Sequence, residues 1–442
     1  MLPLSWNGFG RPATRLRLRV SLLAMLIGAG ALAGCAPRER PRASPRAGAA
    51  PAAVTGDGRF FRGESIGAAI TDRPWVAHVT TADLDRDGRL EILACEAQQG
   101  QVLWLRRDGD GGAWVEHVLA GGLAGPVHVE AVDMDRDGDD DLLVSCMGQV
   151  FPSNERIGSI VLLVNDGRQR FTPRVLLERV ARVNDARGVD FDGDGRLDIV
   201  VGQFGYLQGE VRILWQRKPG VFTSEIMLDL PGTVNVPVAD FDGDGRPDFA
   251  ALVSQQFEEI VLFTNAGGGR FTRRTIFGST NEDFGSSGLV ASDLNRDGRV
   301  DLLYTNGDGF DYAEPGGRPW HGVQWLENKG GGHFELHRIG ELSGAYGPVA
   351  ADFDGDGDLD VAVVSGFNEW RDPQAVSLAV FLNDGAMRFS PQVGAHAPTH
   401  LLTAVAGDFD GSGTPQLVTG GFHAYAPWDR MSRLMIWRVN TP

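Results

Sequence analysis

Cysteine is scarce in this 442-residue chain: Cys35, Cys95 and Cys146 are the only three. They form neither a C-x-x-C-H haem signature nor a zinc-type cluster. Basic residues form no patch, and the formal net charge is −17, which argues against nucleic acid and anionic lipid as partners. The sequence also lacks a nucleophile motif. These absences exclude several classes of cofactor protein and leave no obvious catalytic signature.

The N-terminal apolar run, residues 20–34, is too short for a transmembrane helix and follows the basic segment RLRLR at residues 15–19. Cys35 comes next, so LAGC resembles the lipobox of bacterial lipoproteins. The resemblance implies that residues 1–34 are a signal peptide and that Cys35 is lipidated. A membrane anchor in the bacterial cell envelope would follow. The outer membrane is favoured, because Ala36 is not the aspartate associated with inner-membrane retention. The alternative is an ordinary cleaved signal peptide followed by a chance cysteine.

Residues 35–56 are rich in proline and alanine and have no capacity to form a core. We expect them to be a tether. The remaining residues, 57–442, are expected to form a single repeat domain.

An acidic ten-residue segment occurs seven times in that domain, at intervals of 50 to 59 residues. One copy is DFDGDGRLDI, in which four carboxylates fall within nine residues. Carboxylates about 4 Å apart repel each other by about 1 kcal/mol in water and about 4 kcal/mol near a protein surface. The crowding therefore indicates a bound cation. The seven copies start at Asp83, Asp133, Asp190, Asp240, Asp293, Asp352 and Asp408.

The order of residues in these segments favours calcium. Oxygen ligands at positions 1, 3, 5 and 9, a glycine at position 6 and a main-chain carbonyl at position 7 suit a hard ion of flexible geometry. An EF-hand loop begins in the same way but needs a glutamate at position 12, where this copy has Val201 inside LDIVVG. Branched aliphatic residues after the last carboxylate predict a β-strand, so each segment is expected to be a calcium loop between strands.

Six of the seven loops keep the full set of oxygen ligands, so about six calcium ions are expected. The loop at Asp408 is degenerate, because Ser412 and Gln416 replace two carboxylates. The expected ligands are Asp83, Asp85, Asp87 and Glu91; Asp133, Asp135, Asp137 and Asp141; Asp190, Asp192, Asp194 and Asp198; Asp240, Asp242, Asp244 and Asp248; Asp293, Asn295, Asp297 and Asp301; and Asp352, Asp354, Asp356 and Asp360.

The repeat length leaves room for four short strands and their turns, which predicts an all-β, seven-bladed β-propeller. The last repeat lacks one strand, and residues 56–66 look like the fourth strand of a blade. We expect this N-terminal strand to complete blade seven. The chain resembles the FG-GAP/VCBS repeat family of calcium-loop propellers, which includes the head of integrin α subunits. The resemblance implies adhesion or binding, sometimes as an accessory to enzymes, and names no ligand.

Long aromatic loops are expected on the propeller face opposite the calcium loops. Such loops on a rigid scaffold commonly carry function, and aromatic residues make hot spots or stack on sugars. Five phenylalanines recur at similar places in the repeats and are interpreted as plugs between blades: Phe151, Phe204, Phe310, Phe367 and Phe422. The candidate ligand-binding residues are Tyr206, Tyr312, Trp320, Trp370, Tyr425 and Trp428.

A second candidate site lies on the innermost strands, five residues before each loop. In the first three blades these positions and the ones two residues further along bring together His78, His128, Glu130, Asp185 and Arg187. Such a group is suited to metal binding or acid-base chemistry. A hydrogen-bonded network between blades explains the same residues, and no catalytic role is assigned.

The leading hypothesis is a lipid-anchored, calcium-binding propeller that binds a protein or glycan through its loop-rich face. The alternative is a propeller enzyme acting on carbohydrate, of the polysaccharide lyase or sugar dehydratase type. A purely structural envelope component is a third possibility. Whether Cys95 and Cys146 form a disulfide stays open.

Overall fold

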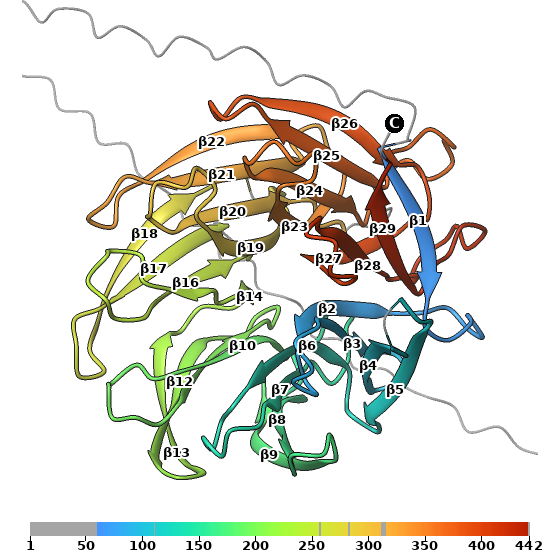
Figure 1. Ribbon diagram of the computed structural model, residues 1–442. Coiled ribbons are helices and arrows are strands. Elements are labelled where there is room, and N and C mark those ends of the chain that lie inside the picture. Colours follow the sequence, from blue (N-terminus) through green and yellow to red (C-terminus); the bar gives the residue numbers. More distant parts are fainter. Residues whose placement is uncertain (1–59, 110, 256–257, 282, 311–314, 441–442) are drawn as a thin grey trace, which may run out of the picture. The chain divides into compact units, whose positions relative to one another are not determined.

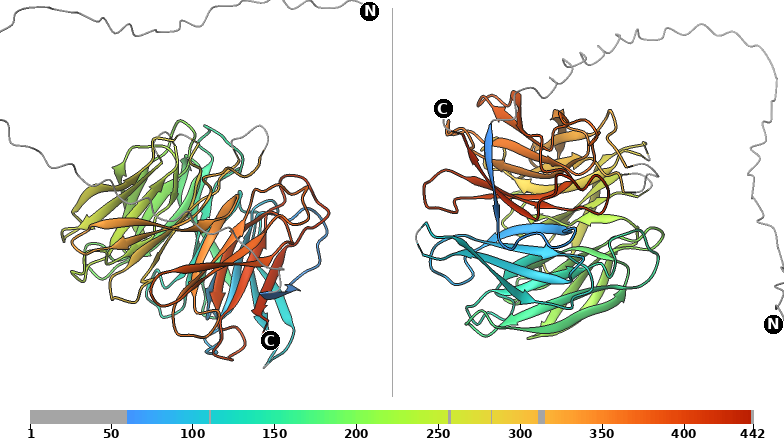
Figure 2. Two further views of the ribbon diagram at one scale, coloured as in Figure 1. Left: turned by 90° about the horizontal axis from the view of Figure 1, so that it is seen from above. Right: turned by 90° about the vertical axis from the view of Figure 1, so that its right-hand side faces the viewer.

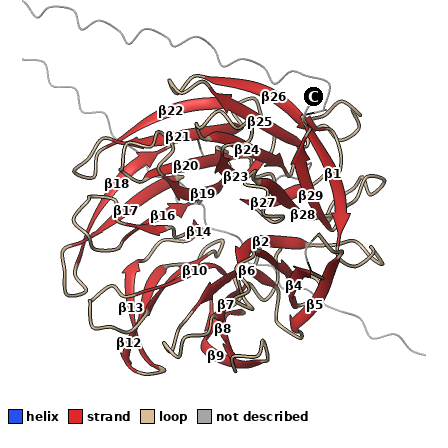
Figure 3. Ribbon diagram, in the orientation of Figure 1, coloured by secondary structure: helices blue, strands red, loops and turns tan. Residues whose placement is uncertain are grey.

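Seven antiparallel sheets follow one another along the chain and form a ring, a seven-bladed β-propeller (Figures 1 and 3). Figure 2 gives two further views of this ring. The structure is a computed structural model that describes residues 60–440 except 110, 256–257, 282 and 311–314. All described residues belong to one unit, Ala50–Pro442. The expected signal peptide, Cys35 and the tether lie outside the described residues, whose secondary structure is strand and turn without helix.

The first four blades are built in chain order from the axis outward. Blade one contains β2 (Val76–Ala82), β3 (Glu91–Glu96), β4 (Gln101–Arg107) and β5 (Trp114–Ala120). Blade two contains β6 (Pro126–Val132), β7 (Asp141–Cys146), β8 (Gly158–Asn165) and β9 (Phe171–Val180). Blade three contains β10 (Val183–Val189), β11 (Asp198–Gln203), β12 (Val211–Lys218) and β13 (Val221–Leu228). Blade four contains β14 (Thr233–Asn235), β15 (Val238–Ala239), β16 (Asp248–Val253), β17 (Glu259–Asn265) and β18 (Phe271–Gly278).

The last three blades follow the same plan, except that blade seven takes its outer strand from the start of the domain. Blade five contains β19 (Ser286–Ser292), β20 (Asp301–Asn306), β21 (Gly322–Asn328) and β22 (Phe334–Glu341). Blade six contains β23 (Ala345–Ala351), β24 (Asp360–Ser365), β25 (Leu378–Asn383) and β26 (Phe389–Ala395). Blade seven contains β27 (Leu401–Gly407), β28 (Gln416–Gly421), β29 (Leu434–Val439) and β1 (Phe61–Ile66).

The hydrophobic core lies between neighbouring blades. The second strand of every blade is buried along its whole length, from DIVVGQ in β11 to QLVTGG in β28. Because neighbouring blades cover both faces of such a strand, its apolar residues run continuously and do not alternate with polar ones. The outermost strands, such as β5 and β13, keep an exposed face. The continuous apolar runs that follow each acidic loop in the sequence therefore mark the buried strands.

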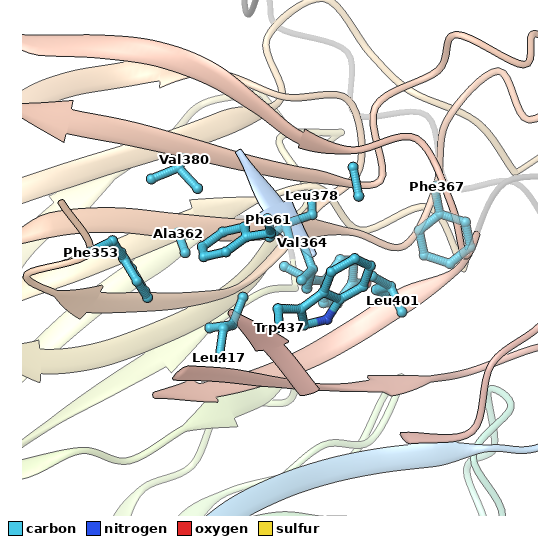
Figure 4. Close-up of a cluster of buried hydrophobic side chains, with 12 residues drawn as sticks. Phe61, Phe353, Ala362, Val364, Phe367, Leu378, Val380, Leu401, Leu417 and Trp437 are labelled. Atoms are coloured by element: carbon cyan, nitrogen blue, oxygen red, sulfur yellow. The ribbon is translucent and has the colours of Figure 1, made fainter. Parts of the chain in front are cut away.

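The first and last strands pair in an antiparallel register that runs from Phe61 opposite Val439 to Ile66 opposite Leu434. Phe61 is buried in a cluster of side chains from blades six and seven, with its ring edge-on to Phe353 at 5.5 Å (Figure 4). The outer strand of blade seven thus comes from the N-terminal end of the described chain.

Cys95 and Cys146 are both buried in one hydrophobic cluster between blades one and two, and neither forms a disulfide. In the part of the chain that the structure describes, no helix is long and apolar enough to cross a membrane.

Candidate functional site

The seven acidic loops join the first and second strands of the seven blades. In each blade the residue at loop position 9 is the first residue of the second strand; Asp198, for example, begins β11. This arrangement places loop positions 1 to 8 in the turn and fixes position 9 on the buried strand. The side chain at position 9 therefore approaches the turn from the start of the second strand. A ligand at this position must do so if it is to share an ion with positions 1, 3 and 5.

Backbone conformation explains the glycine at position 6. Its φ angle is positive in every loop, for example +88° at Gly195 and +84° at Gly245, a region that side chains rarely adopt. The N–H of this glycine donates to the carboxylate at position 1, over 2.9 Å from Gly195 to Asp190 and over 2.7 Å from Gly245 to Asp240. The turn thus folds around its first carboxylate.

The carboxylate at position 9 accepts two backbone hydrogen bonds that fix its orientation. Asp248 accepts from Phe241 N over 2.9 Å and from Asn265 N over 2.7 Å. Burial raises the pKa of this carboxyl to about 6, and the same cause raises the pKa of Asp198, Asp301 and Asp360 to about 6. A nearby cation would oppose this shift, because it favours the charged form.

Four of the acidic clusters bring their ligand oxygens within 4.8 Å of one another. Donor sets made only of oxygen fit Ca²⁺ and do not favour softer transition metals. In several loops an arginine at position 7 also pairs with the aspartate at position 5, which offsets part of the repulsion: Arg89 with Asp87, Arg196 with Asp194, Arg246 with Asp244, and Arg299 with Asp297. Among these clusters are Asp83, Asp85, Asp87 and Glu91; Asp133, Asp135 and Asp137; Asp190, Asp192 and Asp194; and Asp240, Asp242 and Asp248.

The seventh loop is closed by an amide. Gln416 Oε1 accepts from Phe409 N over 2.8 Å, as the aspartate at this position does in other blades. Gln416 Nε2 donates to Asp410 Oδ1 over 3.1 Å, to Ser412 Oγ over 3.4 Å and to the carbonyl of Thr414 over 2.5 Å. The amide N–H groups therefore point at loop oxygens that face an ion in a calcium loop.

The residues on the innermost strands form hydrogen bonds between adjacent blades. Thr403 Oγ1 accepts from Val79 N over 3.0 Å, and His78 Nδ1 accepts from Val129 N over 3.3 Å. Further round the ring, Asp185 Oδ2 accepts from Val236 N over 2.9 Å, and Asn235 Oδ1 accepts from Leu289 N over 3.0 Å. Each of these side chains thus accepts from the backbone of the next blade. Blades five and six have Gly288 and Gly347 at the same position.

The candidate acid-base residues of the first three blades lie together in this network. His78 and His128 have ring centroids 4.2 Å apart, and His128 Nε2 lies 3.2 Å from Asp185 Oδ1. Arg187 Nε lies 3.0 Å from the same oxygen. Glu130 Oε2 accepts from Gly188 N over 2.8 Å. The residues grouped from the sequence therefore lie together. His78, Glu130 and Asp185 each accept a backbone N–H from the next blade, and the contact between His128 and Asp185 joins blades two and three.

Burial determines the direction of the pKa shift for the histidines and for Glu130. It lowers the pKa of His128 to about 3 and raises the pKa of Glu130 to about 7. Burial alone would also raise the pKa of Asp185, but Arg187 and His128 outweigh it and hold that pKa below its usual range. At neutral pH the Asp185–Arg187 pair is charged and both histidines are neutral.

The aromatic loop residues separate into exposed and buried ones. Tyr206 is 47% exposed and Trp428 is 46% exposed, with the Arg73 guanidinium 4.8 Å from the Trp428 ring. Trp320 is half-buried and donates from its indole nitrogen to Asp283 O over 2.8 Å. Trp370 is only 6% exposed and so belongs to the interior. Tyr312 lies outside the described residues.

Tyr425 belongs to an aromatic cluster formed by loops of different blades. Its ring centroid lies 6.0 Å from that of Phe310, 6.1 Å from that of Phe367 and 6.1 Å from that of Phe151. These phenylalanines belong to blades five, six and two. Packing between blades therefore accounts for Phe310 and Phe367, whereas Phe151 also keeps an exposed surface.

Two features escaped the sequence reasoning. Leu207 is 71% exposed beside Tyr206, and its N–H donates to Asn154 Oδ1 of the blade-two loop over 2.8 Å. The sequence predicts that Gln416 removes a carboxylate from the loop, and the structure adds that its amide bonds three loop oxygens. The only signs of these features in the sequence are a leucine in the blade-three loop and a glutamine at position 9 of the seventh loop.

Comparison with known proteins bears on the fold. Two crystal structures of BBS1N in complex with ARL6DN, one soaked with mercury and one with lead, match with a TM-score of 0.50 each. The identities are 12% and 11%, and the matches cover 86% of this chain and 97% and 98% of those chains. At these identities the likeness shows the fold alone. A search of curated proteins finds no match.

The family model described as FG-GAP-like repeat matches residues 83–144, 190–251, 240–304 and 305–363. These regions together make up more than half of the sequence, and each contains at least one acidic loop and all or most of the buried strand that follows it. The chain belongs to the FG-GAP-like repeat family.

Proposed function

We propose that this chain is a calcium-stabilised propeller that binds another protein or a glycan through its loop-rich face. In this proposal a lipid on Cys35 anchors it in the bacterial cell envelope, outside the cytoplasm, and residues 35–56 connect the anchor to the propeller. Calcium at the acidic loops has a structural role, because its ligands lie on the opposite side of the blades from the aromatic loops.

The observation that carries the proposal is an exposed apolar surface on the long loops. We define the loop-face patch as Phe151, Tyr206, Leu207 and Trp428, all of which are exposed. Exposed aromatic side chains on loops that a rigid scaffold holds in place are typical of binding sites.

Contacts between loops connect the members of this patch. Leu207 N bonds to Asn154 of the blade-two loop, and Phe151 of that loop contacts Tyr425 of the blade-seven loop, three residues before Trp428. The patch therefore extends over the loops of blades three, two and seven. Large aromatic side chains held by such contacts lose little entropy when a partner covers them.

The known propellers of similar shape offer a precedent for a protein partner, since BBS1N was crystallised in complex with ARL6DN. The anchor rests on the sequence LAGC at residues 32–35 and on its resemblance to a lipobox.

The proposal is tested by capture of ligands on a glycan array and from solubilised envelope proteins, with the full chain in calcium. The test variant is Tyr206→Ala/Trp428→Ala, and the matched control is Val175→Ala/Val221→Ala, which removes exposed apolar side chains from outer strands. Support requires a ligand that the wild type and the control capture and the test variant loses. A ligand kept by all three proteins would place binding elsewhere.

The anchor has its own test. Cys35→Ala should move the protein from the membrane fraction to the soluble fraction and abolish incorporation of labelled fatty acid. Unchanged membrane association would argue for a different form of attachment.

The carbohydrate-enzyme alternative depends on His78, His128, Glu130, Asp185 and Arg187. If the capture experiments find no ligand, lyase and dehydratase activity should be assayed. Activity that is present in the wild type and lost in Asp185→Asn would point to this group.

A further inference from the structure

A cavity of about 260 Å³ lies inside the ring of innermost strands. Its lining includes residues of all seven innermost strands, β2, β6, β10, β14, β19, β23 and β27, together with loop residues such as Phe204, Phe310 and Phe422. A single water needs only about 10–15 Å³ of such space, so the cavity is large enough for a small organic molecule. The loop-face patch is not part of its lining.

The hydrogen bonds between blades determine which polar atoms of the lining residues remain available to a ligand in this cavity. His78 uses Nδ1 as an acceptor for Val129 N, so its proton lies on Nε2. Asn235 uses Oδ1 as an acceptor for Leu289 N, which leaves its amide N–H groups. Thr403 uses Oγ1 as an acceptor for Val79 N, which leaves its O–H. In each case the acceptor atom joins the blades and a donor remains.

These donors face the cavity. His78, Asn235 and Thr403 all line it, and within the described residues none of the three remaining donor groups reaches a protein acceptor. A donor without an acceptor costs free energy when it leaves water. The cavity therefore favours a ligand that supplies several acceptor oxygens.

Arg187 adds a charged donor to the same wall. Its Nε lies 3.0 Å from Asp185 Oδ1 and its Nη2 lies 3.5 Å from Asp185 Oδ2, while its side chain is 32% exposed and lines the cavity. Asp185 itself does not line the cavity. Its oxygens are taken by Arg187, by His128 and by Val236 N.

The charged residues among the described lining of this cavity are two arginines, Arg182 and Arg187, and one carboxylate, Asp308. Asp308 Oδ1 already accepts from the Tyr346 hydroxyl over 2.7 Å and from Phe310 N over 2.9 Å. The lining thus carries more positive than negative charge, in a chain whose formal net charge is −17.

We propose that this cavity binds a small organic carboxylate. The carboxylate oxygens would accept from Arg187, His78, Asn235 and Thr403. The apolar part would lie against Phe204, Phe310 and Phe422. Guanidinium groups favour carboxylates through directed, charge-assisted hydrogen bonds. This site is separate from the protein- or glycan-binding role of the loop-face patch and does not depend on it.

The test is isothermal titration of the full chain, loaded with calcium, with matched pairs of probes. The first pair is phenylacetate and phenylacetamide; the second is galacturonate and galactose. Within each pair the body is similar and only the first member carries a carboxylate. We expect saturable binding of at least one carboxylate at a ratio of one per chain and at least about tenfold weaker binding of its neutral partner.

Three variants locate the site. Arg187→Gln removes the charged donor. Thr403→Val removes the hydroxyl without changing charge, and with it both the cavity donor and the acceptor of Val79 N. Arg388→Gln is the control, because Arg388 is an exposed turn residue paired with Asp384. Binding should weaken by at least about tenfold in Arg187→Gln, weaken in Thr403→Val and stay unchanged in Arg388→Gln. Thermal unfolding verifies that each variant is folded.

The proposal is overturned if neither carboxylate binds saturably at millimolar concentration, or if the neutral partners bind equally well. Binding that survives in both Arg187→Gln and Thr403→Val would also overturn it. Should Arg187→Gln fail to fold, the comparison of probes on the wild type and the Thr403→Val variant still decide. If the cavity binds no carboxylate, the proposed binding of a partner by the loop-face patch is unaffected. If the loop-face patch captures no ligand, the proposal for the cavity is likewise unaffected.

Discussion

Gln416 Nε2 lies 3.1 Å from Asp410 Oδ1, so an amide group bonds the loop of blade seven where the other blades have a carboxylate at this position. The amide supplies hydrogen bonds to the loop oxygens without any ion. We therefore predict that this loop is the one that binds no calcium. The variant Ser412→Asp/Gln416→Asp restores four carboxylates and should bind one more calcium ion per chain than the wild type, measured by titration calorimetry. An unchanged number of ions would show that the amide is not what keeps calcium out.

Removal of calcium should destabilise the whole propeller. Without ions, the carboxylates of a loop such as Asp190, Asp192 and Asp194 repel one another at the ends of the first two strands. A site at a hundred times its dissociation constant contributes about 2.7 kcal/mol, and several sites act together. Excess chelator should therefore lower the melting temperature by tens of degrees. Calcium should restore it better than magnesium, which demands stricter octahedral geometry. A melting temperature that does not respond to chelator would contradict the calcium assignment.

Phe61→Ala should destabilise the domain by about 3–5 kcal/mol, because the Phe61 ring is buried between blades six and seven. Arg62 is the neighbouring exposed residue on the same strand, and Arg62→Ala should change the free energy of unfolding by less than about 0.5 kcal/mol. Urea unfolding monitored by tryptophan fluorescence measures both. Equal effects of the two changes would mean that β1 does not contribute to the core.

Two tryptophans of the loop-rich face, Trp370 and Trp428, should behave oppositely. Trp370→Ala should cost about 3–5 kcal/mol of stability, since the ring is buried and lies 5.4 Å from His400. Trp428→Ala should leave the free energy of unfolding within about 0.5 kcal/mol of the wild type. Chemical denaturation distinguishes the two, and a stable Trp370→Ala protein would return this residue to the candidate binding surface.

Acidification should destabilise the protein below pH 6.5. Burial lowers the pKa of His400 and of His423 to about 4 in the folded protein, whereas an unfolded histidine has a pKa of about 6.5. The unfolded state therefore takes up protons first, and stability falls as the pH drops from 6.5 toward 4. Each histidine contributes a slope of about 1.4 kcal/mol per pH unit inside this window.

The corresponding measurement is the free energy of unfolding in saturating calcium between pH 7 and pH 5. His423→Gln should flatten the dependence, and His333→Gln, at an exposed position, should not. The same slope in all three proteins would show that other groups control the response.

The blade architecture could be predicted because its information is local and repeated. Each acidic segment predicts a turn, and the apolar run after it forms a strand that is buried on both faces, as β11 and β16 show. The pairing of Phe61 with Val439 was suggested by a missing strand at one end of the repeat array and a spare one at the other. The spacing of the repeats and the number of strands in each repeat were sufficient to predict these features.

The binding surface could not be predicted to the same depth. Trp370 and Trp428 occur in similar aromatic loops, yet one is buried and the other is exposed, because the difference depends on which loops of other blades pack against them. Likewise, the sequence shows that Gln416 lacks a charge but not that its amide reaches three oxygens of the loop. Contacts of this kind arise from geometry that only the closed ring provides.

The pairing of β1 with β29 has a mechanical consequence. Under the proposed anchoring, the chain leaves the propeller toward the membrane from the start of β1, so a pull on a bound partner would be transmitted through this strand. Six residue pairs hold β1 in place, and the buried side chain of Phe61 fixes the start of the strand in the core. Tension would therefore load blade seven before any other blade, and detachment of this one strand would open the ring at its seam while the remaining six blades stayed intact.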